Sequence, residues 1–314
     1  NLFLEQQPEE IQTLRDTLIY PSFSHAVYQM PEAYTITLAR EDHFHISFSE
    51  YLKRFDPEVV LLQAENCLPL YLTCLKLQKK VVYYAQTPFD VEIFQQHQVA
   101  PPLVLANSAF LQKCVTDRFG FKCELLYPAI ESSRYRVERK DPPPDRPLRV
   151  LFINPVPAKG AEIFLALAQH FKDLSFRVLE GWQDFDETFA GRCRALPNVQ
   201  LLPKTWDMAG VYKEADLLIV PSQWEEAFGR VVVEAHAAGV PTLASAVGGL
   251  PEAGGDVGLL VEDFRNPEAW KRTLKHLVDH PAALTPNLEM LQKNVGRFSP
   301  QTAYTRFLEI LEKL

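Results

Sequence analysis

The stretch from Leu217 to Glu252 constrains the fold more than any other part of the chain. An apolar run, Leu217 to Val220, predicts a buried strand that stops at a Pro-Ser pair. A short polar loop then leads into a predicted helix closed by Gly239, and a second buried strand follows at Pro241 to Ser245. Strand, loop, helix and strand in this order make the βαβ unit of a parallel sheet.

The loop after the first of these strands lies at its carboxyl end, where open α/β sheets bind ligands. The helix opens at Phe228 or Gly229, and its first N–H groups and positive dipole end suit an anion such as a phosphate. Glu226 lies in the loop, and Glu234 lies between one and two turns into the helix. Because carboxylates repel phosphate, these two side chains are better placed to accept hydrogen bonds from neutral hydroxyls, as on sugar rings.

The residues Glu226, Phe228, Gly229 and Glu234 form the pattern E-x-F-G-x4-E. This pattern resembles the signature of retaining glycosyltransferases of the GT-B fold, family 4, also described as glycosyl transferases group 1. The flanks agree with that family, from the Pro-Ser pair before the loop to Gly-Gly-Leu-Pro-Glu ending at Glu252. The resemblance implies that Glu234 holds the ribose of a nucleotide, while Glu226 and the amides of Phe228 and Gly229 hold the donor sugar.

A second anion site is predicted where the strand Arg149 to Asn154 gives way to a helix. Lys159 lies in that turn, and Gly160 beside it allows a ligand to approach the backbone closely. In the resembling family this Lys grips the donor diphosphate, and an Arg commonly lies five residues before it. In this chain Asn154 stands at that position instead of an Arg. Lys159 therefore acts with one cation fewer, which weakens phosphate binding unless another residue compensates.

The length of 314 residues suits two domains, and 47% hydrophobic against 23% charged residues suits folded cores. The charged, proline-rich segment Glu138 to Pro147 predicts an interdomain linker. We expect an α/β protein with two Rossmann-like, doubly wound domains facing across a cleft. The first covers residues 1–145 on the acceptor side, and the second, residues 146–299, binds the nucleotide sugar. The resemblance implies that the terminal helix, residues 300–314, packs back on the first domain.

The first half alternates predicted strands with helices, but it departs from the family at two points. No Gly-rich loop follows the predicted first strand, Asn1 to Glu5. The strand Lys80 to Ala85 is followed by Gln86, where the family often has a His. Gln can donate a hydrogen bond to a sugar hydroxyl but cannot move a proton at neutral pH. Gln86 is a candidate for the cleft wall, and a plain polar residue at a strand end is the alternative.

Charge and composition exclude several classes of partner. A net charge of −8 argues against a nucleic-acid surface and allows at most peripheral contact with an anionic membrane. Five scattered cysteines indicate a reducing compartment, and no apolar run reaches membrane-spanning length, so we expect a cytoplasmic protein. Asp184-Phe185-Asp186 mimics the D-x-D metal signature of another glycosyltransferase fold, but it lies in an acid-rich loop. We assign neither a metal nor a cofactor.

The resemblance implies transfer of a sugar from a nucleotide-sugar donor to an acceptor hydroxyl, with retained anomeric configuration and Lys159 and Glu226 as the catalytic residues. The acceptor, whether a glycan, a small molecule, a lipid or a protein, is unknown. Two alternatives stay open. The missing Gly-rich loop, Gln86 and Asn154 favour a non-catalytic partner subunit that keeps the donor fold, and a nucleotide-sugar epimerase would need no acceptor. A dinucleotide oxidoreductase is set aside because no G-x-G-x-x-G follows any strand.

Overall fold

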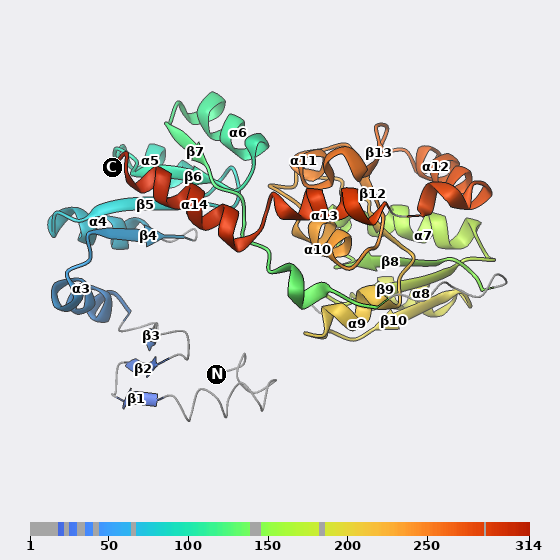
Figure 1. The fold of residues 1–314 in the computed structure, drawn as a ribbon, viewed down its shortest axis with the longest axis horizontal. Helices are drawn as coiled ribbons and strands as arrows, with labels where there is room; N and C mark the ends of the chain where they lie inside the picture. Colours follow the sequence, from blue (N-terminus) through green and yellow to red (C-terminus); the bar gives the residue numbers. More distant parts are fainter. Residues whose placement is uncertain are drawn as a thin grey trace.

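A computed structural model describes most of the chain beyond residue 43 and three short segments before it. The described residues are 18–21, 25–29, 35–39, 44–63, 67–138, 146–181, 186–285 and 287–314. Figure 1 shows two α/β units side by side, each built on a parallel sheet, with a small antiparallel sheet near the N-terminus. We call the unit that spans Phe44 to Leu125 the N unit, and the unit that spans Arg149 to Gly296 the C unit.

The small sheet consists of β1 (Leu18–Pro21), β2 (His25–Gln29) and β3 (Thr35–Ala39), paired in this order. Apolar and polar residues alternate from Tyr34 to Ala39, which predicts a strand, and Thr35–Ala39 form β3. It pairs antiparallel with β2 and does not join the parallel sheet of the N unit. The predicted first strand, Asn1 to Glu5, and the loop after it lie outside the described residues.

The N unit has four parallel strands in sequence order, β4-β5-β6-β7. The strands are β4 (Val59–Leu62), β5 (Lys80–Ala85), β6 (Leu103–Ala106) and β7 (Cys123–Leu125), and the helices are α3 (Phe44–Phe55), α4 (Leu68–Lys76), α5 (Glu92–Gln96) and α6 (Ala109–Phe119). Ser108 is the N-cap of helix α6, and its Oγ accepts a hydrogen bond from the backbone N–H of Leu111 at 2.9 Å. The helix ends at Gly120, which takes the left-handed conformation that favours glycine, with φ +69°.

The C unit has six parallel strands in the order β10-β9-β8-β11-β12-β13. They are β8 (Arg149–Ile153), β9 (Ser175–Leu179), β10 (Val199–Leu202), β11 (Leu217–Val220), β12 (Thr242–Ser245) and β13 (Leu259–Val261). Chain order runs outward in one direction from β8 and in the other from β11. This reversal defines the switch point of a doubly wound sheet, and ligands bind beside it at the carboxyl ends of the strands.

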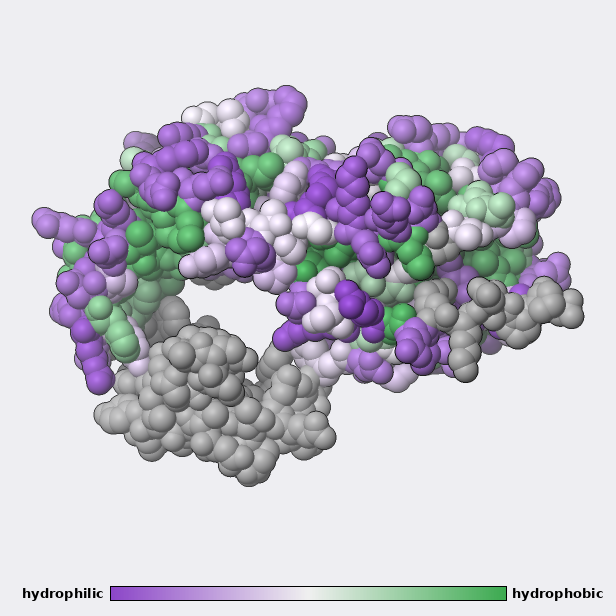
Figure 2. Space-filling view, in the orientation of Figure 1, coloured by the Kyte–Doolittle hydropathy of each residue, from purple (hydrophilic) through white to green (hydrophobic). Residues whose placement is uncertain are grey.

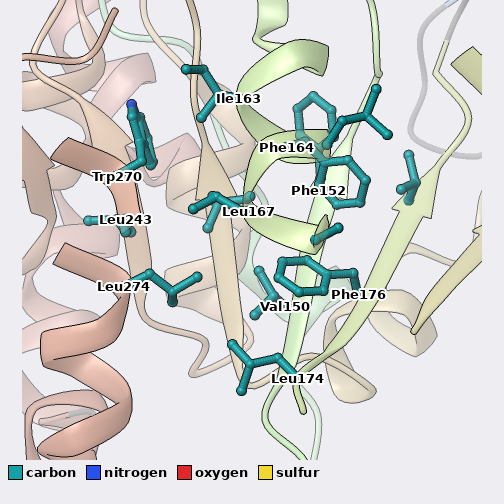
Figure 3. Packing of buried hydrophobic residues seen from close by; sticks show 14 of the residues in the cluster. Val150, Phe152, Ile163, Phe164, Leu167, Leu174, Phe176, Leu243, Trp270 and Leu274 are labelled. Carbon is teal, nitrogen blue, oxygen red and sulfur yellow. The ribbon is translucent and has the colours of Figure 1, made fainter. Parts of the chain in front are cut away.

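Helices cover both faces of this sheet because each carries one apolar side. They are α7 (Ala161–His170), α8 (Glu187–Arg194), α9 (Met208–Lys213), α10 (Arg230–Ala237), α11 (Leu250–Gly254), α12 (Pro267–Asp279) and α13 (Leu288–Gly296). Figure 3 shows the core on the α7 side, where the Phe152 and Phe164 rings stack at 5.1 Å and Phe176 meets Phe164 edge-on. Burying one such ring contributes roughly 1.5–3 kcal/mol.

The last helix, α14 (Pro300–Leu311), leaves the C unit and lies across the sheet of the N unit (Figure 1). Its Ile310 side chain is fully buried against Val82 and Leu105, and Arg306 pairs with Glu124 at 2.8 Å. The predicted linker Glu138 to Pro147 is described only at its ends, so the division of the chain into domains there stays a prediction.

Apolar side chains are exposed on both units. Figure 2 shows hydrophobic residues, in green, gathered over the N unit at the left of the view. Exposed apolar side chains there include Leu61 on β4 and Leu72 and Leu75 on α4. No helix among the described residues has both the length and the apolar character needed to cross a bilayer. The C unit also exposes large apolar side chains, among them Trp206, Trp224, Leu288 and Met290.

Candidate active site

The two predicted anion sites lie next to each other at the switch point of the C-unit sheet. Strand β11 pairs with β8, with Leu217 opposite Val150 and Ile219 opposite Phe152. The segments that follow these two strands carry Glu226 and Lys159. They therefore leave the same edge of the sheet from adjacent positions, as the order of a doubly wound sheet requires.

The turn after β8 is packed directly against the turn after β11. A short 3₁₀ helix, Pro157–Lys159, leads to Gly160, which has φ +89° and begins α7. A Cβ atom at Gly160 would lie 2.0 Å from the backbone oxygen of Pro221. The Gln223 N–H also donates to the Ala158 carbonyl at 2.8 Å. Only a residue without a side chain therefore allows the two turns to meet.

Lys159 and Glu226 form a partly buried ion pair across these turns. The Lys159 Nζ atom lies 2.5 and 2.7 Å from the two carboxylate oxygens of Glu226. Only 19% of the Lys159 side chain and 10% of the Glu226 side chain is exposed. Ser222 Oγ donates to the same carboxylate, and the Trp224 ring lies 5.0 Å from Nζ. The structure thus brings together the two residues that the sequence analysis proposed as catalytic.

The loop after Glu226 is held by its own aromatic residue. Phe228 is buried, and its ring lies 5.0 Å from that of Phe298 and 6.0 Å from that of Tyr127. Gly229 follows with φ +102°, and a Cβ atom there would lie 2.5 Å from the Leu250 side chain. Helix α10 begins at the next residue, Arg230, so its unpaired N–H groups lie directly beside the loop.

Glu234 is the fifth residue of α10, at the predicted depth of between one and two turns. It is 8% exposed, and its Oε2 accepts a hydrogen bond from the Tyr212 hydroxyl at 3.1 Å. The Arg230 Nε atom lies 3.6 Å from Oε1. Burial first, and then the charge of Glu234, raises the pKa of the Tyr212 hydroxyl well above its usual value. Tyr212 therefore stays protonated and acts as a donor that orients Glu234.

Asn154 ends β8 in a strained conformation. Its φ is +61°, and its backbone N–H donates to the Leu179 carbonyl at 3.0 Å. Its Oδ1 atom is buried without a hydrogen-bond partner among the described residues. A Cβ atom at Gly181 would lie 2.4 Å from that oxygen. A non-glycine residue in this conformation with an unsatisfied acceptor is a marked departure from a relaxed strand end.

The structure places Gln86 apart from the ion pair, at the carboxyl end of β5 in the N unit. Its side chain is exposed, while its backbone N–H donates to Asp90 at 2.6 Å. Asp90 also accepts hydrogen bonds from the backbone N–H and the hydroxyl of Thr87. This network fixes the turn after β5, and among the described residues no hydrogen bond or ion pair joins the Gln86 side chain to the Lys159–Glu226 pair.

The D-x-D sequence has a local structural role at its last residue. Asp184 and Phe185 lie outside the described residues. Asp186 is the N-cap of α8, and its carboxylate accepts a hydrogen bond from the Phe189 N–H at 2.9 Å. Helix capping therefore explains this carboxylate.

Sequence reasoning did not assign three polar side chains that contact the predicted carboxylates Glu226 and Glu234: Ser222, Tyr212 and Arg230. Ser222 adjoins the loop and was treated only as part of the family pattern. Arg230 places a cation in the first turn of a helix, where the dipole disfavours it, and that local conflict is a signal in the sequence. Tyr212 gave no local signal, because its contact with Glu234 spans 22 residues.

Comparisons with known proteins show which chains are similar in sequence and fold. The profile of the family described as glycosyl transferases group 1 matches residues 136–314. The D-inositol 3-phosphate glycosyltransferase of Rhodococcus opacus (strain B4) is 42% identical over 94 residues, 29% of this chain and 21% of that protein. The enzyme of the same name from Corynebacterium glutamicum (strain R) is 47% identical over 75 residues, 23% of this chain and 18% of that protein. These matches span about a fifth of the relatives' length.

Solved structures share the fold across most of the chain. Anabaena HepE, in a crystal structure with UDP and glucose, has a TM-score of 0.71 at 18% identity, covering 85% of this chain and 81% of that one. Sucrose-phosphate synthase from Thermosynechococcus elongatus has a TM-score of 0.70 at 19% identity, covering 95% and 85%. The predicted fold, two Rossmann-like units of the GT-B type, is confirmed. With more than half of its residues matched by the family profile, the chain belongs to the glycosyl transferases group 1 family.

Proposed function

We propose that the chain transfers a sugar from a nucleotide diphosphate sugar to an acceptor hydroxyl, with retained anomeric configuration and without a metal ion. One observation carries this proposal: a half-buried lysine lies against a buried carboxylate at the switch point of a doubly wound sheet, beside the start of α10. Related structures support the choice of donor, because Anabaena HepE was solved with UDP-glucose. The chain matches only about a fifth of the length of the curated relatives, so the identities of the donor and the acceptor belong to this proposal.

The diphosphate is the group that the positive charges suit. As the bond from the sugar to the phosphate breaks, negative charge grows on the leaving diphosphate. Lys159 and the first N–H groups of α10 supply preorganised positive charge for that group. Asn154 adds no charge, so the cation count is one lower than the family pattern implies. Arg230, in the first turn of α10, is the residue positioned to compensate.

The two carboxylates serve the neutral ends of the donor. Glu226 holds Lys159 in place and orients the donor sugar through its hydroxyl groups. Glu234, whose carboxylate is fixed by Tyr212, accepts hydrogen bonds from the ribose hydroxyls. An ionised carboxylate accepts hydrogen bonds only, and sugar hydroxyls donate them, so both contacts are favourable.

No side chain at the site is an obvious nucleophile, so we infer a substitution on a single face of the sugar. The anomeric carbon loses its bond to the diphosphate oxygen and gains a bond to the acceptor oxygen. The acceptor proton passes to the leaving phosphate oxygen, which balances the charge. Lys159 stabilises the diphosphate throughout, and Glu226 holds the sugar. A product with inverted anomeric configuration, measured by NMR, would contradict this step.

The test begins with thermal-shift screening against UDP, GDP, ADP and dTDP sugars. We expect one nucleotide class to raise the melting temperature of the chain because it binds the folded state. Release of free sugar from that donor, measured with and without EDTA, then tests turnover and metal independence together. A rate that EDTA abolishes and Mg²⁺ restores would overturn the metal-independent mechanism.

Asn154 and Gln86 favour one other function, a partner subunit that binds the donor without turning it over. The unsatisfied, buried Oδ1 of Asn154 stands where the family pattern has a cation. Donor hydrolysis by the purified chain excludes that alternative, because a non-catalytic subunit binds a nucleotide sugar and leaves it intact. An epimerase would instead release an isomerised sugar without any acceptor.

A further inference from the structure

Glu252 connects the two units through the start of helix α6. Both of its carboxylate oxygens accept a hydrogen bond from the Ala109 N–H at 2.9 Å, and Oε2 lies 3.4 Å from the Phe110 nitrogen. Oε1 also accepts from the Tyr127 hydroxyl at 2.5 Å. Glu252 belongs to α11 of the C unit, 143 residues after Ala109 of the N unit. One carboxylate thus satisfies backbone donors that helix α6 leaves unpaired.

Two further contacts join α6 to the loop that carries Glu226. Ser108 Oγ, which accepts from the first turn of α6, donates to the backbone oxygen of Ala227. Arg118, near the end of α6, pairs with Glu225 at 3.0 Å. Glu225 and Ala227 are the residues on either side of Glu226. Helix α6 therefore contacts the loop on both sides of the candidate catalytic carboxylate.

The turn before Glu252 packs directly against the backbone of the loop that carries Glu226. The Gly249 N–H donates to the backbone oxygen of Glu226 at 2.7 Å. Cβ atoms at Gly248 and Gly249 would lie 2.3 Å from the Glu226 oxygen and 2.5 Å from the Ala227 oxygen. The Ala253 N–H in turn donates to the Gly249 carbonyl at 2.9 Å. A displacement of α11 would therefore displace the backbone of the loop.

We propose that Glu252 is a positioning residue, which fastens the N-terminus of α6 to the C unit and so sets the place of Glu226 relative to the N unit. The inference rests on the proposed function, in which the N unit presents the acceptor and Glu226 holds the donor sugar. In this proposal the donor sugar and the acceptor lie on different units, and a connection such as this one fixes the distance between them. Misplacement by about 1 Å costs on the order of 100-fold in rate.

The negative charge of Glu252 matters as well as its shape. The N-terminus of α6 carries the positive end of the helix dipole, which a carboxylate complements better than an amide. Glu252 is also half-buried beside Tyr127. Burial, together with the hydrogen bond and the charge of Glu252, raises the pKa of Tyr127 to about 12. Tyr127 therefore remains a donor to Glu252 at every pH at which the protein is assayed.

The experiment compares Glu252→Ala and Glu252→Gln with the parent. Glu268→Ala is the matched control, because Glu268 is an acid in the first turn of α12 and pairs with Lys271 inside the C unit. The first readout is hydrogen exchange of the peptide that contains Ala109 and Phe110. The second is the affinity for UDP together with kcat and KM for hydrolysis of UDP-glucose, or of the donor that the nucleotide screen identifies.

In Glu252→Ala we expect exchange at Ala109 and Phe110 to accelerate at least tenfold and kcat to fall at least tenfold. UDP affinity should stay within twofold, because the nucleotide contacts lie in the C unit. Glu252→Gln should recover part of the kcat, and Glu268→Ala should match the parent in all readouts. Unchanged exchange or an unchanged kcat in Glu252→Ala would overturn the proposal, as would an equal loss of UDP affinity. If exchange is altered in Glu252→Ala but the parent binds no nucleotide, the result would instead contradict the proposed function.

Discussion

At the scale of single residues, Lys159 supplies the positive charge of the candidate site and Glu226 holds it in place. The pair is shielded from water, so its charges are screened less than those of an exposed pair. Single substitutions here therefore separate the binding of the nucleotide from the chemical step.

Lys159→Ala should lower kcat by about 100-fold, because it removes a preorganised donor aimed at the leaving diphosphate. The control is Lys275→Ala, which removes an exposed lysine paired with Asp279 on α12. Steady-state hydrolysis of the identified donor measures the effect, and the melting temperature of each variant shows whether it folds. Turnover equal to that of the parent would mean that the diphosphate lies elsewhere.

Glu234→Ala should weaken nucleotide binding about tenfold, which corresponds to one hydrogen bond to a charged acceptor. Tyr212→Phe should weaken it less, because it frees the Glu234 carboxylate without removing it. Calorimetric titration with the nucleoside diphosphate measures both. A Glu234→Ala variant that binds like the parent would show that this carboxylate does not hold the ribose.

The sequence pattern predicted Glu226, Glu234 and Lys159 as site residues, but it did not predict that Lys159 and Glu226 form a pair. Their contact spans 67 residues and depends on β8 and β11 being neighbours in the sheet. Gln86 was predicted for the wall of the cleft on the N unit, and it lies at a strand end of that unit with an exposed side chain, so its part in the site stays a prediction. Strand-end positions are readable from local patterns, whereas their distances across two units are not.

At the scale of elements, two glycines of the C unit offer a direct comparison. Gly160 has φ +89° and would place a Cβ atom 2.0 Å from the Pro221 oxygen, whereas Gly191 lies inside α8 with no atom within 4 Å of such a Cβ. Gly160→Ala should destabilise the fold by roughly 1–3 kcal/mol or more. Gly191→Ala should stabilise it by roughly 0.5–1 kcal/mol, because alanine is the better helix former. Urea unfolding measures both, and equal effects would refute the strain assigned to Gly160.

His236 links α10 to β12 and α13, and the pKa of its ring differs between the folded and the unfolded chain. Its Nδ1 accepts from the Asn294 amide at 3.1 Å, so its Nε2–H faces Thr242 Oγ1 at 3.0 Å. Burial lowers the pKa of His236 to about 4 from its usual 6.5. Between these pH values the unfolded chain binds more protons than the folded one, so stability falls as pH drops through this window.

The free energy of unfolding of the parent should therefore fall relative to that of His236→Gln as pH drops from 6.5 to 4. The shift corresponds to at most about 3 kcal/mol, since one pKa unit is 1.36 kcal/mol. Urea unfolding of both proteins across this range measures the difference, and the shared carboxylate titrations cancel. A difference that is constant with pH would show that His236 does not titrate with folding.

Most elements were predictable within one or two residues, because apolar runs and capping residues mark their ends. Ser108, Asn266 and Ser299 each cap the helix that follows them. The pairing of β3 was not predictable, because an alternating pattern gives a strand but not its partner. It pairs antiparallel with β2, although its neighbours along the chain suggested a parallel sheet.

At the scale of the whole molecule, helices α6 and α14 hold the two units in one arrangement. The first N–H groups of α6 donate hydrogen bonds to Glu252 of the C unit, and α14 extends from the C unit onto the sheet of the N unit (Figure 1). The sequence indicated the second connection through the family resemblance. It gave no indication of the first, because a contact across 143 residues leaves no local pattern.

Ile310 tests how far the N unit depends on α14. Its side chain is fully buried against Val82 and Leu105, whereas Leu308 on the same helix is 42% exposed. Ile310→Ala should destabilise the protein by roughly 2–5 kcal/mol, because it removes apolar contacts and leaves a cavity. Leu308→Ala should cost well under half as much, and helix propensity cannot explain the difference because both variants place alanine in α14. Hydrogen exchange in β5 and β6 should accelerate only in Ile310→Ala if the helix stabilises that sheet. Equal exchange in the two variants, or a loss of protection confined to α14, would show that the sheet of the N unit folds without it.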